Sequence, residues 1–95
     1  MSLTYAPTRG TKTEIPVAVY GNRWCGESQM ARRALQRAGI PYAYVDLDDH
    51  PEAKQKLQWL AGGLLHTPVI YVDGEWLMEP STGELRAALM RHGAL

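Results

Sequence analysis

The sequence predicts an α/β fold of the order β-α-β-α-β-β-α, with a four-stranded mixed sheet flanked by three helices. Short apolar runs alternate along the chain with segments whose apolar residues recur at helical spacing. Asp73-Gly74 between two such runs predicts a tight β-hairpin. The chain has 95 residues, which suits a single domain. We assign residues 15–95 to this domain and residues 1–14 to a flexible N-terminal arm.

The first half of the chain predicts two strands joined by a helix. Residues 15–20 form a short apolar run typical of a buried strand, and residues 26–38 have a helical pattern. Gly39 and Pro41 predict where that helix ends, because glycine adopts a left-handed conformation and proline cannot continue a helix. Residues 42–47 predict a second strand, parallel to the first through a right-handed crossover. The inward face of the helix is predicted to contain Met30, Ala31, Ala34, Leu35 and Ala38.

The second half predicts a helix, a hairpin and a last helix. Residues 51–61 begin with a proline and an acid, as helices often do, and stop at Gly62-Gly63. Residues 69–72 and 75–78 are the strands of the hairpin. Ser81-Thr82-Gly83-Glu84 fits a capping box that opens the last helix. The predicted inward residues of the two helices are Ala53, Leu57, Leu60 and Ala61, and then Leu85, Ala88 and Leu89.

Composition excludes several classes of function. Ten basic and ten acidic side chains give no net charge, so neither a nucleic acid nor an anionic membrane is expected as a partner. No apolar run is long enough for a membrane span, and residues 1–14 lack the apolar core of a secretory signal. The single cysteine rules out an intramolecular disulfide and gives a structural zinc site no support. We expect a reducing, cytoplasmic location and no metal site.

The single cysteine, Cys25, lies where the first strand passes into the first helix. Backbone N–H groups at a helix start have no internal partner, and the helix dipole is positive there. Thiols in this position titrate at roughly 3.5–7.5, against about 8.5 for a free thiol. Arg23 adds a positive charge and Glu27 opposes it, so we expect a moderate lowering. The alternative, a buried and inert thiol, fits less well beside the polar residues on both sides.

Three motifs together resemble the glutaredoxin family of thioredoxin-fold proteins. These are Trp24-Cys25-Gly26-Glu27-Ser28, Thr67-Pro68 before a strand, and the hairpin Tyr71-Val72-Asp73-Gly74. The likeness runs from residue 15 to residue 95. Ala61-Gly62-Gly63 and Leu77-Met78-Glu79-Pro80-Ser81 look most like the mycoredoxin-type glutaredoxins of actinobacteria. Each motif falls in the matching place of the predicted fold.

The resemblance implies a role for each residue of the site. Cys25 would be the nucleophile of thiol–disulfide exchange, and Pro68 would follow a cis peptide bond beside it. The backbone of Thr67 would pair with the cysteinyl part of a small thiol. Trp24, from its own place in the loop, is expected to be an exposed platform beside the sulfur rather than a core residue. The carboxylates of a bound tripeptide thiol would be held by Ser81 and Thr82 at one end, and by Gln55, assisted by Arg23, at the other.

The small thiol is not fixed by the resemblance. Glu79-Pro80 replaces the family's usual Gly-Gly, and Asn22 replaces its lysine. Glutathione, mycothiol and bacillithiol all remain candidate cosubstrates, and the partners would be oxidised or thiolated proteins acting on a monomer.

Ser28 stands where dithiol relatives have a second, resolving cysteine. A hydroxyl cannot resolve a mixed disulfide, although it can donate a hydrogen bond to the Cys25 thiolate. The remaining route is a monothiol mechanism, in which a second small thiol releases the first. Ser28 is either natural or a substitution introduced into a two-cysteine enzyme, and the sequence does not separate these readings.

Two other functions fit the same motifs. Cys-Gly-Glu-Ser differs at one position from the Cys-Gly-Phe-Ser signature of iron–sulfur carriers, in which a dimer bridges a [2Fe-2S] cluster. Trp24 replaces the lysine of those relatives, which speaks against this function. The third reading is a binding module that kept the fold and lost its activity.

Overall fold

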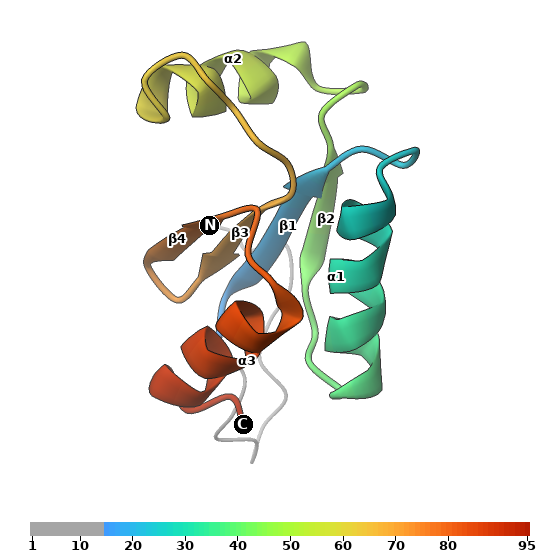
Figure 1. Ribbon diagram of the computed structural model, residues 1–95, viewed down its shortest axis with the longest axis vertical. Coiled ribbons are helices and arrows are strands. Elements are labelled where there is room, and N and C mark those ends of the chain that lie inside the picture. Colours follow the sequence, from blue (N-terminus) through green and yellow to red (C-terminus); the bar gives the residue numbers. More distant parts are fainter. Residues whose placement is uncertain (1–14) are drawn as a thin grey trace.

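The computed structural model describes residues 15–95, so the predicted arm of residues 1–14 lies outside the described residues. Its element order is the predicted one, and the four strands form one mixed sheet in the spatial order β2-β1-β3-β4 (Figure 1). β2 runs parallel to β1, and the other neighbouring pairs are antiparallel. The elements are β1 (Val17–Gly21), α1 (Gly26–Arg37), β2 (Ala43–Asp46), α2 (Pro51–Leu60), β3 (Val69–Val72), β4 (Glu75–Met78) and α3 (Thr82–Arg91).

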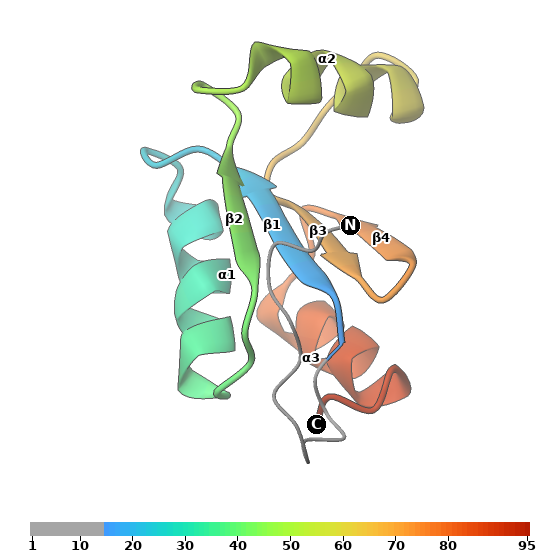
Figure 2. The same cartoon turned by 180° about the vertical axis from the view of Figure 1, so that it is seen from behind.

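The helices cover the sheet unequally. α1 and α3 lie on the same face, so in the view from behind the strands stand in front of them (Figures 1 and 2). The main core lies between this face and the two helices, with Val19, Leu35 and Ile70 fully buried. Each such side chain contributes roughly 1.5–3 kcal/mol through removal from water. α2 lies at one end of the sheet, where Leu57 packs with Leu47 and Val69 in a smaller cluster.

The turns follow the predicted chemistry. Gly39 has a φ of +70°, and the N–H of Ile40 donates to the carbonyl of Leu35 at 3.0 Å, which ends α1 as predicted. Asp73 and Gly74 both have positive φ, as the tight hairpin requires. The turn at Gly39 ends α1, and the turn at Asp73-Gly74 ends β3 and reverses the chain into β4.

The capping box of α3 is present. Ser81 Oγ accepts from the N–H of Glu84 at 3.1 Å, and the Ser81 N–H donates to the Glu84 carboxylate at 2.8 Å. This pair of bonds fixes the direction in which the chain enters α3 after the hairpin.

Three inward assignments from the sequence are wrong. Met30 is 56% exposed and Ala38 is exposed, because the inner stripe of α1 consists of Ser28, Ala31 and Leu35. The helical pattern considered only apolar residues, so it did not predict that Ser28 is buried. Leu60 is 58% exposed, because α2 covers only the end of the sheet and only Leu57 of its residues is buried.

Several loops meet at one end of the sheet. β1 ends there and passes into α1, β3 begins there, and α2 lies over the same end (Figure 1). The start of α3 faces the first turn of α1 across a groove. Within residues 15–95, no helix is long and apolar enough to cross a membrane. The predicted site residues lie in these loops and helix starts, except Gln55, which lies within α2.

Candidate active site

Cys25 is the N-cap residue of α1. Its backbone is extended, its carbonyl accepts from the N–H of Gln29 at 3.1 Å, and its own N–H donates to the carbonyl of Asn22 at 3.1 Å. A short turn therefore connects β1 to α1 and places the thiol at the start of the helix. The thiol is free and partly exposed. Access to solvent and a helix start behind the sulfur both favour a reactive thiolate.

The loop before β3 approaches the sulfur from the opposite side. The Thr67–Pro68 peptide bond is cis, which confirms the expectation drawn from the resemblance, and Pro68 is buried. Thr67 Oγ1 lies 4.0 Å from Cys25 Sγ and can donate to it. The carbonyl of Pro68 accepts from the N–H of Glu79 at 2.7 Å, which ties this loop to the end of β4. Cys25, Thr67 and Pro68 therefore form one cluster.

Ser28 lies beneath the thiol, in the first turn of α1. It is fully buried, and its hydroxyl accepts from the backbone N–H of Asn22 at 3.3 Å. A cysteine that resolves a disulfide bonds directly to the reactive sulfur. Ser28 instead offers a hydroxyl donor at the same turn.

Opposing effects set the pKa of Cys25. Partial burial of the sulfur raises the pKa, but hydrogen bonds from the side chain and backbone of Ser28, from the Thr67 hydroxyl and from the Glu27 N–H lower it, and the net result lies below the ordinary value. The Cys25 sulfur accepts no close hydrogen bond from the backbone at the start of α1. The N–H groups of Glu27 and Ser28 therefore act on it at longer range. The direction agrees with the expected moderate lowering.

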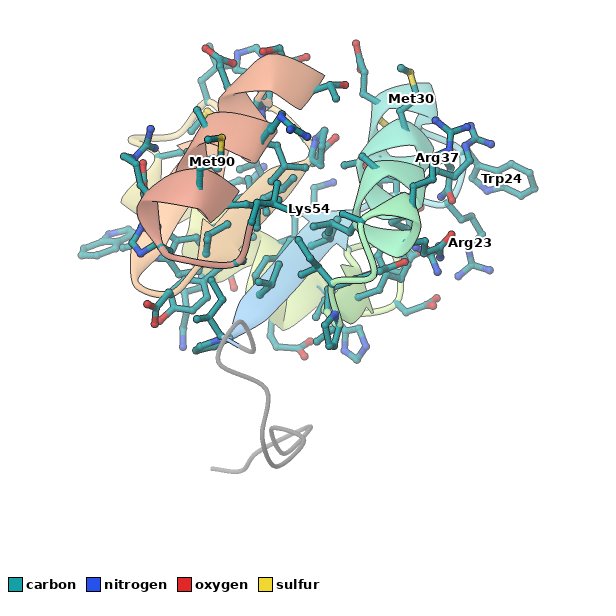
Figure 3. The ribbon with its side chains drawn as sticks, turned by 90° about the horizontal axis from the view of Figure 1, so that it is seen from below. Arg23, Trp24, Met30, Arg37, Lys54 and Met90 are labelled. Atoms are coloured by element: carbon teal, nitrogen blue, oxygen red, sulfur yellow. The ribbon has the colours of Figure 1, made fainter. Side chains whose placement is uncertain are left out.

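Arg23 and Trp24 precede the cysteine and point away from the core. Arg23 Nε donates to Asp46 at 3.0 Å and its Nη2 donates to Asp49 at 2.7 Å. Its guanidinium is thus held against the start of the β2–α2 connection rather than free beside the sulfur. Trp24 is 87% exposed, and Figure 3 shows its indole projecting away from the protein. Trp24 therefore offers a free aromatic face next to Cys25.

A groove of about 180 Å³ lies between the first turns of α1 and α3. Its lining includes Glu27, Met30, Pro80, Ser81 and Thr82, so two predicted ligand-binding residues line this groove. Among the described residues, no acceptor takes the N–H groups of Thr82 or of the residue after it. These amides at the helix start can bind an anionic or strongly polar group.

Gln55 lies apart from this groove, on an exposed face of α2. His66 is half-exposed, and its Nδ1 lies 3.8 Å from the carboxylate of Glu79. Within residues 15–95, Gln55 and His66 form no hydrogen bond or ion pair with Cys25 or with each other.

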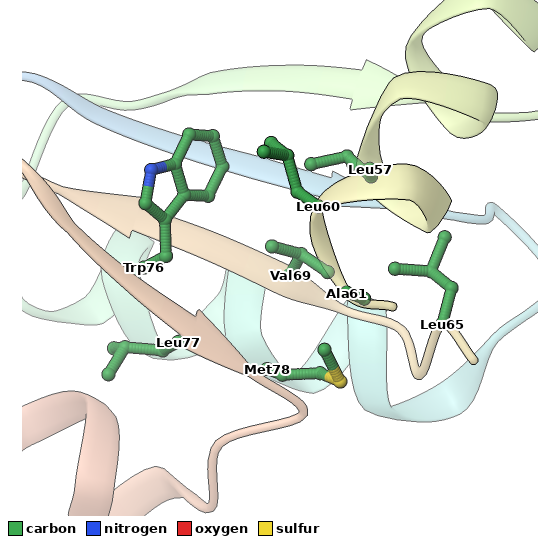
Figure 4. Close-up of a pocket in the computed structure, with 8 residues that line it drawn as sticks. All are labelled: Leu57, Leu60, Ala61, Leu65, Val69, Trp76, Leu77 and Met78. Atoms are coloured by element: carbon green, nitrogen blue, oxygen red, sulfur yellow. The ribbon is translucent and has the colours of Figure 1, made fainter. Parts of the chain in front are cut away.

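A second hollow, of about 290 Å³, lies on the α2 side of the sheet (Figure 4). Leu57, Leu60, Trp76 and Met78 are among its lining residues, and none of them can ionise.

Asp46 and Glu79 have clear structural roles at the site, although neither was predicted from the sequence to be a site residue. Asp46, at the end of β2, is nearly buried and accepts from Arg23, Tyr44 and the N–H of Asp48. Glu79 adopts a positive φ of 49° where it bonds the Pro68 carbonyl. The sequence indicated a special conformation at Glu79 only through the resemblance, because the glutaredoxin family usually has Gly-Gly where this chain has Glu79-Pro80.

The fold and the site together are those of the thioredoxin-fold class of thiol oxidoreductases, with one free, partly exposed cysteine at the start of α1. The glutaredoxin family model matches residues 17–77, which includes the cysteine, the cis proline and the hairpin. The chain therefore belongs to the glutaredoxin family. Among curated proteins, no sequence matches it significantly.

Solved structures with the same fold share little sequence with this chain. The NrdH-redoxin of Escherichia coli is 19% identical with a TM-score of 0.68, over 77% of this chain and 93% of its own. A glutaredoxin of Archaeoglobus fulgidus is also 19% identical, with a TM-score of 0.67 over 79% and 85%. A wheat glutaredoxin is 18% identical, with a TM-score of 0.63 over 87% of both chains. These similarities establish the fold.

Proposed function

We propose that this protein reduces mixed disulfides between proteins and a low-molecular-weight thiol, by a monothiol mechanism at Cys25. The observation that carries the proposal is a partly exposed thiol with a lowered pKa, placed between the start of α1 and the cis-proline loop. Ser28 in place of a second thiol restricts the chemistry to one protein sulfur. The protein would act as a monomer, in the reducing cytoplasm.

The reaction has two exchange steps. The Cys25 thiolate attacks the small-thiol sulfur of a protein mixed disulfide, forms a new disulfide with it and releases the protein thiolate. A second small thiolate then attacks the sulfur of the bound small thiol. That step releases a symmetrical small disulfide and regenerates Cys25 as a thiolate. Each step breaks one S–S bond and forms one, and the small thiol supplies both electrons.

The small thiol would lie along the groove between α1 and α3. The backbone of Thr67 would hold its cysteinyl part, Trp24 would cover it, and the amides at Thr82 would bind its far end with help from Ser81. Gln55 and Arg23 would contact a second polar end. Arg23 can do so only by sharing its guanidinium with Asp46 and Asp49. Glutathione, mycothiol and bacillithiol are the candidates.

Mass spectrometry of the intact protein tests the proposal directly. The protein is incubated separately with oxidised glutathione, oxidised mycothiol and oxidised bacillithiol, and the matching adduct on Cys25 identifies the cosubstrate. Turnover of a protein mixed disulfide with that thiol follows, with Cys25→Ala as the inactive control. An ordinary thiol pKa with no adduct and no turnover would contradict the proposal.

Ser28→Cys separates the monothiol route from a dithiol one. If Ser28 replaces a resolving cysteine, the variant would release the small-thiol adduct as an intramolecular disulfide, and turnover would rise. If the monothiol route is native, turnover would stay equal or fall, because the disulfide is an unproductive side product. Colour after anaerobic cluster reconstitution, together with dimer formation, would instead support the iron–sulfur carrier function.

A further inference from the structure

Gly21, the last residue of β1, lies against Ser28 so closely that no other residue fits. A Cβ atom at Gly21 would lie 2.3 Å from Ser28 Oγ and 2.8 Å from Ser28 Cβ. The hydroxyl could rotate away, but Ser28 Cβ is fixed to the first turn of α1. Gly21 is not among the residues with positive φ, so its conformational freedom is not required. The lack of a side chain is the property that matters.

Gly21 also lies next to the other half of the site. The same Cβ position is 3.8 Å from Cβ of Pro68, which is ordinary van der Waals contact. An added methyl group would therefore have Ser28 on one side and the cis-proline loop close by. Turning the Ser28 hydroxyl out of its position would relieve only the contact with Oγ, and relief of the contact with Cβ also requires α1 to move away from β1.

The bonds of the Ser28 hydroxyl explain why its position matters. A hydroxyl has one hydrogen to donate and two lone pairs. One lone pair accepts from the N–H of Asn22, and the residue is fully buried, so water does not compete. The hydroxyl hydrogen is then free for the Cys25 sulfur, which lies three residues earlier at the N-cap of the same helical turn. Hydrogen bonding from Ser28 is among the causes that lower the pKa of the thiol.

We propose that Gly21 is a positioning residue for Cys25, because its missing side chain lets the Ser28 hydroxyl lie at the end of β1 and donate to the reactive sulfur. The inference rests on the proposed function only in taking Cys25 as the reacting thiol. Gly21 touches no reacting atom and acts through Ser28. A side chain at residue 21 would displace the Ser28 hydroxyl and weaken its hydrogen bond to the sulfur, without itself contacting the thiol.

A four-member cycle tests this role. The proteins are the wild type, Gly21→Ala, Ser28→Gly and the double variant, and the rate of iodoacetamide alkylation against pH gives the pKa of Cys25. Loss of one charge-assisted hydrogen bond is expected to raise this pKa by about one unit in each single variant. The double variant is expected to match Ser28→Gly, because both changes act through the same hydroxyl.

Gly26→Ala is the matched control. Gly26 directly follows Cys25 and, like Gly21, is not among the residues with positive φ, but a Cβ there would meet nothing within 4 Å. This variant is expected to leave the pKa of Cys25 unchanged. A glycine substitution near the thiol is therefore predicted to matter only where it displaces Ser28.

Thermal unfolding of the same proteins keeps the test decisive if Gly21→Ala folds poorly. The clash is expected to lower Tm by at least about 5 °C in the wild-type background. In the Ser28→Gly background the same change is expected to have little effect, because both obstructing atoms are gone. An equal loss of Tm in both backgrounds, or an unchanged thiol pKa in folded Gly21→Ala, overturns the inference. Alkylation needs no disulfide substrate. A negative result for Gly21 can therefore be distinguished from a failure of the protein to reduce mixed disulfides.

Discussion

The carboxylate of Glu27 gives a quantitative prediction about the Cys25 thiol. Glu27 Oε1 lies 3.9 Å from Cys25 Sγ, with the protonated thiol as the donor. A thiolate at this distance meets a like charge, which favours the neutral form. Glu27→Gln removes the repulsion, so we expect the pKa of Cys25 to fall.

The size of the effect follows from the exposure of the pair. Two unit charges about 4 Å apart interact by about 1 kcal/mol in water, which corresponds to about 0.7 pH unit. Salt at about 0.15 M screens charges over about 8 Å and leaves roughly half of this energy. We therefore expect the pKa of Cys25 to fall by about 0.3–0.7 unit. Raising the salt should lower this pKa in the wild type and leave the variant unchanged.

Thiolate absorbance against pH measures the shift. Glu52→Gln is the control, because Glu52 also lies in the first turn of a helix and its replacement changes the net charge equally. An equal fall in the control would mean that net charge, not the contact, is responsible. A pKa that rises in Glu27→Gln at low salt would refute the electrostatic reasoning.

Three further predictions concern stability. Glu79→Gly is expected to stabilise the protein by about 1 kcal/mol in urea unfolding, because Glu79 has a φ of +49°, which favours glycine; a loss of stability would show that this conformation is unstrained. Ser81→Ala removes the capping box and is expected to cost about 1 kcal/mol in the same assay, whereas Ser81→Asp should retain most of the stability. Hydrogen bonds from His92 and Arg91 hold the pKa of Glu75 below its usual value. The stability that these bonds contribute is therefore present above the unfolded pKa and is lost as pH falls through the folded pKa. Tm should fall less steeply with acid in Glu75→Gln, and parallel curves would contradict this linkage.

Local rules explain why much of the fold could be predicted from the sequence. Gly39 ends α1, Asp73-Gly74 forms the hairpin and Ser81 caps α3 as predicted, because these conformations depend on neighbouring residues alone. The position of Cys25 at a helix start is equally local, since it follows from where the strand pattern stops and the helical pattern begins. The family resemblance supplied the cis bond at Pro68, which no local pattern predicts.

The tertiary structure alone decided which side chains meet around the sulfur. Ser28, a polar residue, takes an inward position of α1 while the apolar Met30 is exposed, because the angle at which α1 packs selects the buried stripe. The guanidinium of Arg23 faces two carboxylates that follow it by more than 20 residues. The requirement for glycine at residue 21 exists only because α1 folds back onto the end of β1. Contacts between distant segments depend on packing, and a single sequence records no distances between them.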